Sequence, residues 1–487
     1  MKRSQETSAA GEPRRGGWVL ALLPATMLGV LLLRHVWDVD IFWQLRLGEL
    51  ILERGGPVPT EPFAATHLGE PLPAVAWLGQ ALFAAARYLG GWTGLRLFDA
   101  LCWCGGFWAL AAACRKRGAD AASVALALAA AFLVALATAS IRPQTYGVLC
   151  FGVLLALLKL NLSWRLTVAL GTPLLVLWQN LHPSVSIGAA ALGAYAVGGW
   201  FAWYRNRDTV SPSAPPWAAT ILVPIAFLSL IATPDGLGGL AVSARNAQAS
   251  ILVGASEWLP LWAPSNHHHV PRIAALALLA AWALWRAWPR LDWADAAVMV
   301  ALLVLTVSAY RFVLFWAVAT IPVVASLRWR GALAGSPAPS GDHTHAQRAV
   351  MVGALVATAM VTPLVKPTQF SDNLPLDAVA SLVATDVRGT IFTEPEFGGV
   401  LIDEGHPRWL VSYDGRYYRY TDEEWGRFGY ILGGRVKLRD VVRRYRPAAF
   451  LLRPSHSTYL CNELDRPGSG WRRIYKDEGA AVWIPAD

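Results

Sequence analysis

Long runs of apolar residues alternate with short polar connections along most of the chain. A helix that crosses a bilayer needs about 20 predominantly apolar residues. By this rule about eleven segments are predicted to span a membrane, namely 18–34, 93–113, 120–140, 143–160, 165–181, 184–204, 217–233, 271–288, 292–308, 312–327 and 349–366. No small-residue cleavage site follows the first run, so we interpret it as a retained helix rather than a signal peptide.

The connection between the first two spans, residues 34–92, is long enough to hold structure of its own. Segment 38–54 has an apolar stripe with its charged residues elsewhere, and segment 74–90 is short and flanked by Trp. Both patterns are typical of helices that lie along the membrane interface. Several prolines between residues 57 and 73 predict an extended connection between them. Loops of this length are usually functional.

The last part of the chain has a different pattern. Residues 371–487 are more polar and contain short strand signals, GTIFT, RWLVSYDG, PAAFLLRP and the pair RRIYKD and AAVWIP, with helical signals between them. We predict a transmembrane module over 1–370 and a small soluble α/β domain over 371–487. The stretch 329–348, rich in Gly, Ser, Pro and His, is interpreted as a connector.

Composition and charge agree with a membrane protein. Only 15% of the residues are charged, against about 25% in soluble proteins, and there are 24 Trp, a residue that favours membrane interfaces. The net charge of +9 does not indicate nucleic-acid binding, because the basic residues lie in short clusters between apolar runs. Five cysteines without a CxxC pair predict neither a disulfide framework nor a zinc site.

The basic clusters also predict the topology. Short cytoplasmic loops are enriched in Lys and Arg, and every basic cluster falls on one side if 74–90 lies in the interface instead of crossing. This predicts that the N-terminus lies in the cytoplasm and the C-terminal domain outside it, on a multi-pass protein of the plasma (inner) membrane.

Ionisable residues from separate stretches then fall at the outer face, where burial of charge at the bilayer edge indicates function. They are Asp38, Asp40, Arg142, His182, Glu257, Tyr310 and Arg311. The two aspartates could act as a general base or hold a divalent cation, or could cap the helix that begins near Ile41. We favour Asp38 as the base because it lies closest to the end of the first span.

The remaining members of this group each have two interpretations. Arg142 and Arg311 could bind a phosphate oxygen or extend to the interface as ordinary cationic side chains. His182 could shuttle a proton or bind phosphate, or be structural, and Glu257 could pair with an arginine or be a solvated loop acid.

Other polar stretches are weaker candidates. The run 267–269, three histidines, is interpreted as a solvated loop, because adjacent side chains point in different directions. In the C-terminal domain, 396–399 and 414–416 could contact substrate, although Asp-Gly at 414–415 is typical of a turn. No nucleotide-binding phosphate loop is present in the sequence.

The stretch WDVDIFWQLRLGELILERGGPVPTEPF, followed by WLGQALFA, IRPQ, WQNLH, EWLP, SAYRF, EFGGVLI and YDGR, resembles a group of bacterial polytopic membrane proteins. That group is similar to the GT-C glycosyltransferase superfamily, and the resemblance covers nearly the whole chain. The chain departs from the group at His182-Pro183, where His-Gly is usual.

The resemblance implies an inverting enzyme that moves a sugar from a polyprenyl-phosphate donor to a glycan, lipid or protein acceptor outside the cytoplasm. By motif position, Asp38 or Asp40 would be the base, and Arg142, His182 and Arg311 would face the donor phosphate. Two alternatives stay open, a transporter or flippase of a lipid-linked glycan and a non-catalytic scaffold for cell-envelope glycan assembly. A transporter would carry charges near the bilayer midplane, where this sequence has few.

Overall fold

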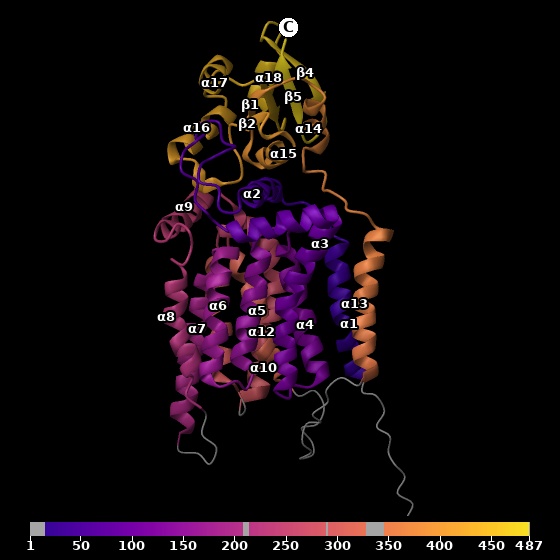
Figure 1. Ribbon diagram of the computed structural model, residues 1–487, viewed down its shortest axis with the longest axis vertical. Coiled ribbons are helices and arrows are strands. Elements are labelled where there is room, and N and C mark those ends of the chain that lie inside the picture. The colour runs from indigo at the N-terminus through magenta and orange to yellow at the C-terminus, as the bar shows by residue number, and fades with distance from the viewer. Residues whose placement is uncertain (1–14, 208–213, 289–290, 328–344, 487) are drawn as a thin grey trace, which may run out of the picture.

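The computed structural model describes residues 15–207, 214–288, 291–327 and 345–486, and in it a helical bundle carries a smaller α/β unit on one end (Figure 1). The bundle helices are α1 (Arg15–Leu32), the second part of α3 (Trp77–Lys116), α4 (Ala121–Ala135), α5 (Gln144–Lys159), α6 (Trp164–Leu181), α7 (Val185–Asn206), α8 (Trp217–Ser229), α10 (Val270–Ala287), α11 (Trp293–Ser308), α12 (Val313–Ala325) and α13 (His345–Val365). Short 3-10 turns adjoin them, η1 (Leu136–Thr138), η2 (Ser256–Trp258), η3 (Pro264–His269) and η5 (Tyr310–Phe312).

Each predicted span coincides with one of these helices. Among the described residues, 5 helices are long and apolar enough to cross a membrane by length and composition, and others, including α5 and α11, are apolar but shorter. The chain is therefore a mostly helical protein with several candidate membrane spans. The total of about eleven crossings stays a prediction.

The bundle is packed through small residues at its centre and is apolar at its edge. Gly106 and Gly152 bring α3 and α5 so close that a Cβ on either would collide with the other helix, as is common where membrane helices pack. All of α12 is buried. By contrast, α13 is largely exposed along its apolar length and lies beside α1 (Figure 1), which suits contact with lipid.

Two helical segments lie across the end of the bundle, below the α/β unit (Figure 1). They are α2 (Asp40–Arg54) and the first part of α3, which is separated from the second part by a kink at Gly90 and Gly91. The interfacial segment predicted over 74–90 and the span that follows it therefore form one helix, α3, with a kink between its two parts. Helix α2 is buried on more than its apolar stripe, because Gly48 packs on α3 and Gly399 of the α/β unit packs on Val39.

The α/β unit contains a five-stranded sheet of order β2-β1-β3-β5-β4, where β1 pairs parallel with β2 and β3, and β5 pairs antiparallel with β3 and β4. All the predicted strand signals form strands. In chain order the elements are α14 (Leu376–Val383), β1 (Gly389–Thr393), α15 (Pro395–Gly405), β2 (Trp409–Val411), η6 (Tyr417–Arg419), α16 (Asp422–Leu432), α17 (Leu438–Tyr445), β3 (Ala449–Leu452), α18 (Thr458–Leu464), β4 (Trp471–Lys476) and β5 (Ala481–Pro485). Ala64 of the first loop adds a bridge beside β2, at Val411.

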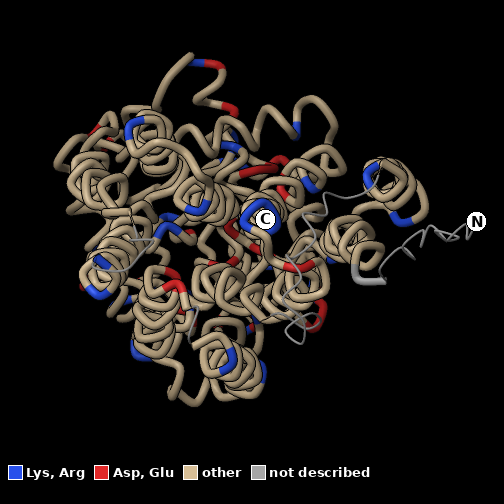
Figure 2. Tube along the Cα trace, turned by 90° about the horizontal axis from the view of Figure 1, so that it is seen from below, with Lys and Arg blue, Asp and Glu red and all other residues tan. Residues whose placement is uncertain are grey.

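In the view along the bundle from below, Lys and Arg are distributed over several helices (Figure 2). Some of them occupy the last turns of α3, α5, α7 and α10 as Arg115 and Lys116, Lys159, Arg205 and Arg286. The N-terminal cluster, residues 289–290 and most of the connector 329–348 lie outside the described residues. The arrangement agrees with basic clusters on one side, and which side faces the cytoplasm stays a prediction.

Candidate functional site

A cavity of about 460 Å³ lies where the bundle meets the α/β unit. Its charged and histidine lining residues are Asp40, Arg142, His182, Glu257, Arg311 and Arg416. The first five are sequence candidates that come from five separate stretches of chain, and the fold brings them to one space. Asp38 and Tyr310 are not among the lining residues.

Asp40 is the first residue of α2, and its carboxylate faces the cavity. Its Oδ1 accepts a hydrogen bond from Trp43 Nε1 at 3.1 Å. Burial and the neighbouring charge of Asp38 raise the pKa of Asp40 to about 7, although Arg142 and Trp43 act in the opposite direction. A carboxylate with a pKa near neutrality is well matched to general base catalysis.

Asp38 is buried and has a different role in the local structure. Its Oδ1 accepts the backbone N–H of Asp40, the first residue of α2, at 3.0 Å, although the N-cap residue itself is Val39. Its Oδ2 lies 2.8 Å from Arg142 Nε, close enough for an ion pair, although the angles do not meet those of a hydrogen bond. Access to the cavity therefore favours Asp40, and not Asp38, as the candidate base.

Arg142 lies between η1 and α5 and is held among oxygen atoms. Its Nε donates to Ser140 Oγ at 2.8 Å, and its Nη1 lies 3.6 Å from Glu257 Oε2. Burial alone would lower the pKa of Arg142, but Asp38 and Glu257 reverse this and raise it above its ordinary value. For the carboxyl group of Glu257 the effects are opposite: burial would raise its pKa, but Arg142 and Arg311 bring it below the ordinary value. This pair therefore stays charged.

Arg311 differs from Arg142 because its charge is less fully paired. Its guanidinium lies over the ring of Trp258, 3.6 Å from the ring centroid. Its Nη1 is buried and has no hydrogen-bond partner among the described residues. Arg311 lines the cavity, and a guanidinium that is not fully hydrogen-bonded is suited to an anionic ligand such as a phosphate oxygen.

His182 ends α6 and also faces the cavity. Its Nδ1 lies 2.8 Å from Ser184 Oγ. Burial, with help from the charges of Arg311 and Arg142, lowers the pKa of His182 to about 3. The imidazole is therefore neutral near pH 7 and can donate or accept one hydrogen bond there, but it does not supply a positive charge.

Tyr310 lies in a separate cluster with His268 and His269. The Tyr310 ring stacks on His269, with centroids 4.0 Å apart, and its hydroxyl accepts a hydrogen bond from Arg272 at 3.0 Å. No described residues form a group of three or more His, Cys, Asp or Glu that could hold a metal ion. Because Asp38 and Glu257 are both paired with Arg142, the oxygen ligands near Asp40 do not fit a divalent cation.

Much of the cavity wall was not singled out from the sequence. Helix α9 (Gly238–Leu252) contributes the small polar side chains Ser243, Asn246 and Ser250, and the bundle end contributes Gln44 and Gln80. No charge or motif marks these residues. The α/β unit contributes 415–418, so the predicted Asp-Gly-Arg turn does reach the cavity, whereas Glu396 does not line it.

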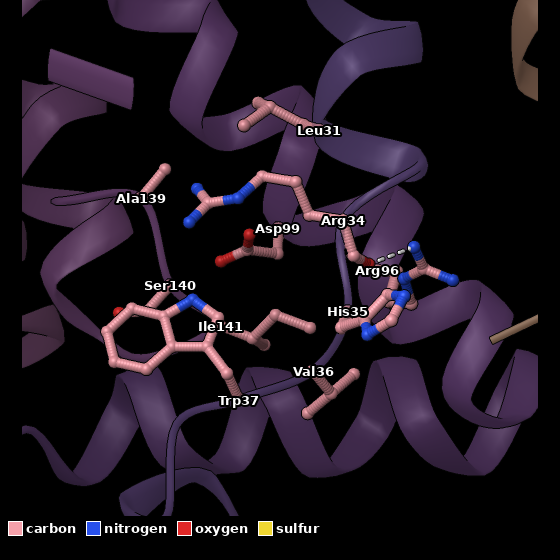
Figure 3. Close-up of a pocket in the computed structure, with 10 residues that line it drawn as sticks. All are labelled: Leu31, Arg34, His35, Val36, Trp37, Arg96, Asp99, Ala139, Ser140 and Ile141. Carbon is pink, nitrogen blue, oxygen red and sulfur yellow. Dashed lines mark hydrogen bonds between the residues drawn. The ribbon is translucent and has the colours of Figure 1, made fainter. Parts of the chain in front are cut away.

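A smaller pocket of about 30 Å³ is lined by residues of three segments, 31–37, 96–99 and 139–141 (Figure 3). In Figure 3 the side chains of Arg34 and Asp99 point toward its interior, near Ser140 and Trp37. Asp99 Oδ1 accepts a hydrogen bond from Thr145 at 2.7 Å, and Arg34 Nη1 donates to the carbonyl of Leu136 at 2.9 Å. The pocket has room for about one water molecule. The hydrogen bonds of Arg34 to Leu136 and of Asp99 to Thr145 hold the chain on the two sides of the Ser140–Arg142 connection.

No family model matches the sequence, and no curated protein matches it. Among solved structures, the oligosaccharyltransferase of Archaeoglobus fulgidus, tethered to an acceptor peptide, is 11% identical, with 97% of this chain and 74% of that chain covered at a TM-score of 0.51. ArnT from Cupriavidus metallidurans gives TM-scores of 0.42 in the apo state (12% identity, 96% of this chain and 97% of that chain) and 0.41 bound to undecaprenyl phosphate (13%, 96% and 98%). The likeness to the oligosaccharyltransferase extends over almost the whole chain, and the protein therefore has a fold of the GT-C type.

Proposed function

We propose that this protein is a membrane glycosyltransferase that moves a sugar from a polyprenyl-phosphate carrier to a nucleophilic acceptor outside the cytoplasm. The observation that carries the proposal is that Asp40 and Arg311 line one cavity at the end of the bundle. A carboxylate with a pKa of about 7 and an incompletely paired guanidinium thus lie in the same space. The fold of the GT-C type supports the same class of reaction.

The chemistry needs a base and an anion-binding group. In the proposed reaction Asp40 takes the proton of the acceptor as the acceptor attacks the anomeric carbon, and the bond from that carbon to the phosphate oxygen breaks. Direct displacement from the opposite side inverts the anomeric centre. The departing phosphate gains negative charge, which Arg311 stabilises and to which neutral His182 donates a hydrogen bond.

The remaining charged residues would position these groups. Arg142 is already neutralised by Asp38 and Glu257, so it orders the start of α2 and the loop that carries Glu257 rather than supplying free charge. The oligosaccharyltransferase of similar fold was crystallised with an acceptor peptide. Helix α9 and residues 415–418 both line the cavity, so a protein, glycan or lipid acceptor would contact them there.

A transporter is less well supported. The buried charged residues of the described helices lie toward the ends of the bundle, where Arg96 donates to the carbonyl of Arg34 and Lys159 pairs with Asp292 at 2.7 Å. A path for a charged headgroup across the bilayer would place such groups near its middle.

The experiment that tests the function uses cells that lack the gene and are complemented with the wild type, Asp40→Asn, Arg311→Gln or the exposed control Asp386→Asn. Protein levels are matched, and polyprenyl-phosphate sugars and extracytoplasmic glycans are measured by mass spectrometry. We expect the deletion, Asp40→Asn and Arg311→Gln to accumulate one lipid-linked sugar and lose one glycan. The loss of transfer rate for Asp40→Asn should be on the order of 10²- to 10⁴-fold.

Two other results would contradict the proposal or the assignment of the base. If the deletion changes no lipid-linked sugar, the glycosyltransferase proposal is wrong. If the deletion has the expected effect but Asp40→Asn behaves like Asp386→Asn, Asp40 is not the base, and a transporter or scaffold role becomes the better explanation.

A further inference from the structure

A buried network of charges joins the first outer loop to the α/β unit. The side chains of Arg416, Glu61 and Asp414 are wholly buried. Arg416 donates from Nη1 to Glu61 Oε2 at 2.7 Å, from Nη2 to Glu61 Oε1 at 2.9 Å, and from Nη2 to Asp414 Oδ2 at 2.6 Å. In the chain, Glu61 is 355 residues from Arg416, and Asp414 is two residues from it.

The network is fully hydrogen-bonded on its acidic side as well. Glu61 Oε1 accepts the backbone N–H groups of Phe63 and Ala64 at 2.8 and 2.9 Å. Asp414 Oδ1 accepts the backbone N–H of Arg416 at 2.9 Å, and Asp414 Oδ2 accepts the hydroxyl of Tyr420 at 3.2 Å. The guanidinium therefore has little freedom to move.

The turn that contains Arg416 touches the candidate base. Gly415 lies so close to Asp40 Oδ1 that a Cβ at position 415 would collide with it. The Arg416 guanidinium lies 5.8 Å from the ring centroid of Trp43, and the indole Nε1 of Trp43 is the group that donates to Asp40 Oδ1. The turn thus covers Asp40 directly and also backs the side chain that orients it.

A buried ion cluster is weak evidence for stability, because removing charges from water offsets most of their attraction. The close hydrogen-bonded geometry of this cluster is better explained if the cluster fixes the position of the turn that carries Arg416. We propose, on the basis of the function proposed above, that Glu61, Asp414 and Arg416 are positioning residues that hold the 414–416 turn against Asp40, fixing the orientation of its carboxylate and excluding water from it.

The pKa of Asp40 should depend on how closely the 414–416 turn covers it. The charged and polar groups near it are Asp38 and Arg142 behind the start of α2, Glu257 of η2, Trp43 of α2 and Tyr417 of η6. Burial is the main reason that the pKa of Asp40 is raised to about 7. If the turn loosens and water enters, this pKa must fall toward the ordinary carboxyl value.

The test uses the full-length protein in detergent with Arg416→Lys, Glu61→Gln and Gly415→Ala. Lysine keeps the charge but cannot make the bidentate contacts of arginine, and alanine displaces Asp40 without changing any charge. Gly405→Ala is the control for a collision inside the α/β unit, against Trp409, and Gly426→Ala is the control at a position with open space.

Two measurements are made on each variant. Transfer is measured as kcat and KM with the polyprenyl-phosphate sugar that accumulates in the deletion strain. Protonation of Asp40 is measured without any substrate, as the pH dependence of its labelling by a hydrophobic carbodiimide, quantified by mass spectrometry.

We expect a labelling midpoint near pH 7 in the wild type and a lower midpoint in Arg416→Lys, Glu61→Gln and Gly415→Ala. Their kcat should fall on the order of 10²-fold with little change in KM, because small misplacements of a catalytic group have this effect. Gly405→Ala and Gly426→Ala should keep the wild-type midpoint.

An unchanged midpoint in both Arg416→Lys and Gly415→Ala overturns the positioning proposal, and so does an equal shift in Gly405→Ala. If the midpoint shifts as expected while the wild type transfers no sugar, the positioning role stands and the proposed function fails.

Discussion

Asp38 and Asp40 are separated by one residue, yet their carboxylates meet different surroundings. Asp38 is turned toward the N–H of Asp40 and toward Arg142, so its charge is used inside the protein. Asp40 faces the cavity and has one side-chain donor, Trp43. The same residue type therefore has a structural role at position 38 and is a candidate base at position 40.

The pKa of Asp40 predicts how transfer depends on pH. Because the base must be ionised and burial raises its pKa to about 7, kcat should rise as the pH increases through about 7 and should level off above about pH 8. The measurement is kcat of the detergent-solubilised protein between about pH 5 and 9.

His182 provides the control for this assignment. Since its pKa is lowered to about 3, it does not change charge in this range, and His182→Gln should lower activity without moving the midpoint. A midpoint near about 6.5 that disappears in His182→Gln would instead assign the titration to the histidine.

Among the helices, α3 is kinked, and it contributes Gln80 to the cavity wall. Its first part carries Gln80 across the end of the bundle to the cavity, and its second part turns down into the bundle (Figure 1). The turn is made at Gly91, whose φ of 58° and ψ of −155° are accessible to glycine and unfavourable for other residues.

We therefore predict that Gly91→Ala destabilises the protein by about 1–3 kcal/mol, the strain of an L-residue in that conformation. Gly90→Ala is a matched control, because position 90 has φ of −141° and a Cβ added at either glycine would meet no atom within 4 Å. Thermal unfolding of both variants in detergent measures the difference. Equal unfolding temperatures would show that the kink does not depend on the glycine backbone.

At the scale of the whole molecule, the bundle has a basic end and an end that carries the cavity and the α/β unit (Figure 1). If Lys and Arg mark the cytoplasmic side, the α/β unit lies outside the cytoplasm. This orientation also places Asp40 and Arg311 at the outer surface of the plasma membrane.

The orientation predicts the labelling of single introduced cysteines. Glu478→Cys, exposed in the β4–β5 connection, should react with a membrane-impermeant maleimide in intact cells, and Ser163→Cys, exposed before α6, should react only after the cells are opened. The wild type is the background control, since its cysteines are buried or partly buried. The reverse labelling pattern would invert the topology and would place the proposed site in the cytoplasm.

The sequence by itself determined the positions of the bundle helices, the strands of the α/β unit and the charged clusters between the apolar runs, but it did not indicate helix α9. These features depend on local apolar runs, on alternation over a few residues and on charge near helix ends, all of which can be read along the chain. The family resemblance correctly indicated the GT-C type of fold.

Only the tertiary structure decided which carboxylate faces the cavity and which guanidinium there keeps an N–H without a hydrogen-bond partner among the described residues. The side chains of Asp38 and Asp40 differ because Arg142, more than 100 residues away, pairs with one of them, and Glu61 meets Arg416 only after the α/β unit docks. Burial, ion pairing and pKa depend on neighbours that are distant in sequence. For the same reason α2, which has the pattern of a surface helix, is buried between two layers of the protein.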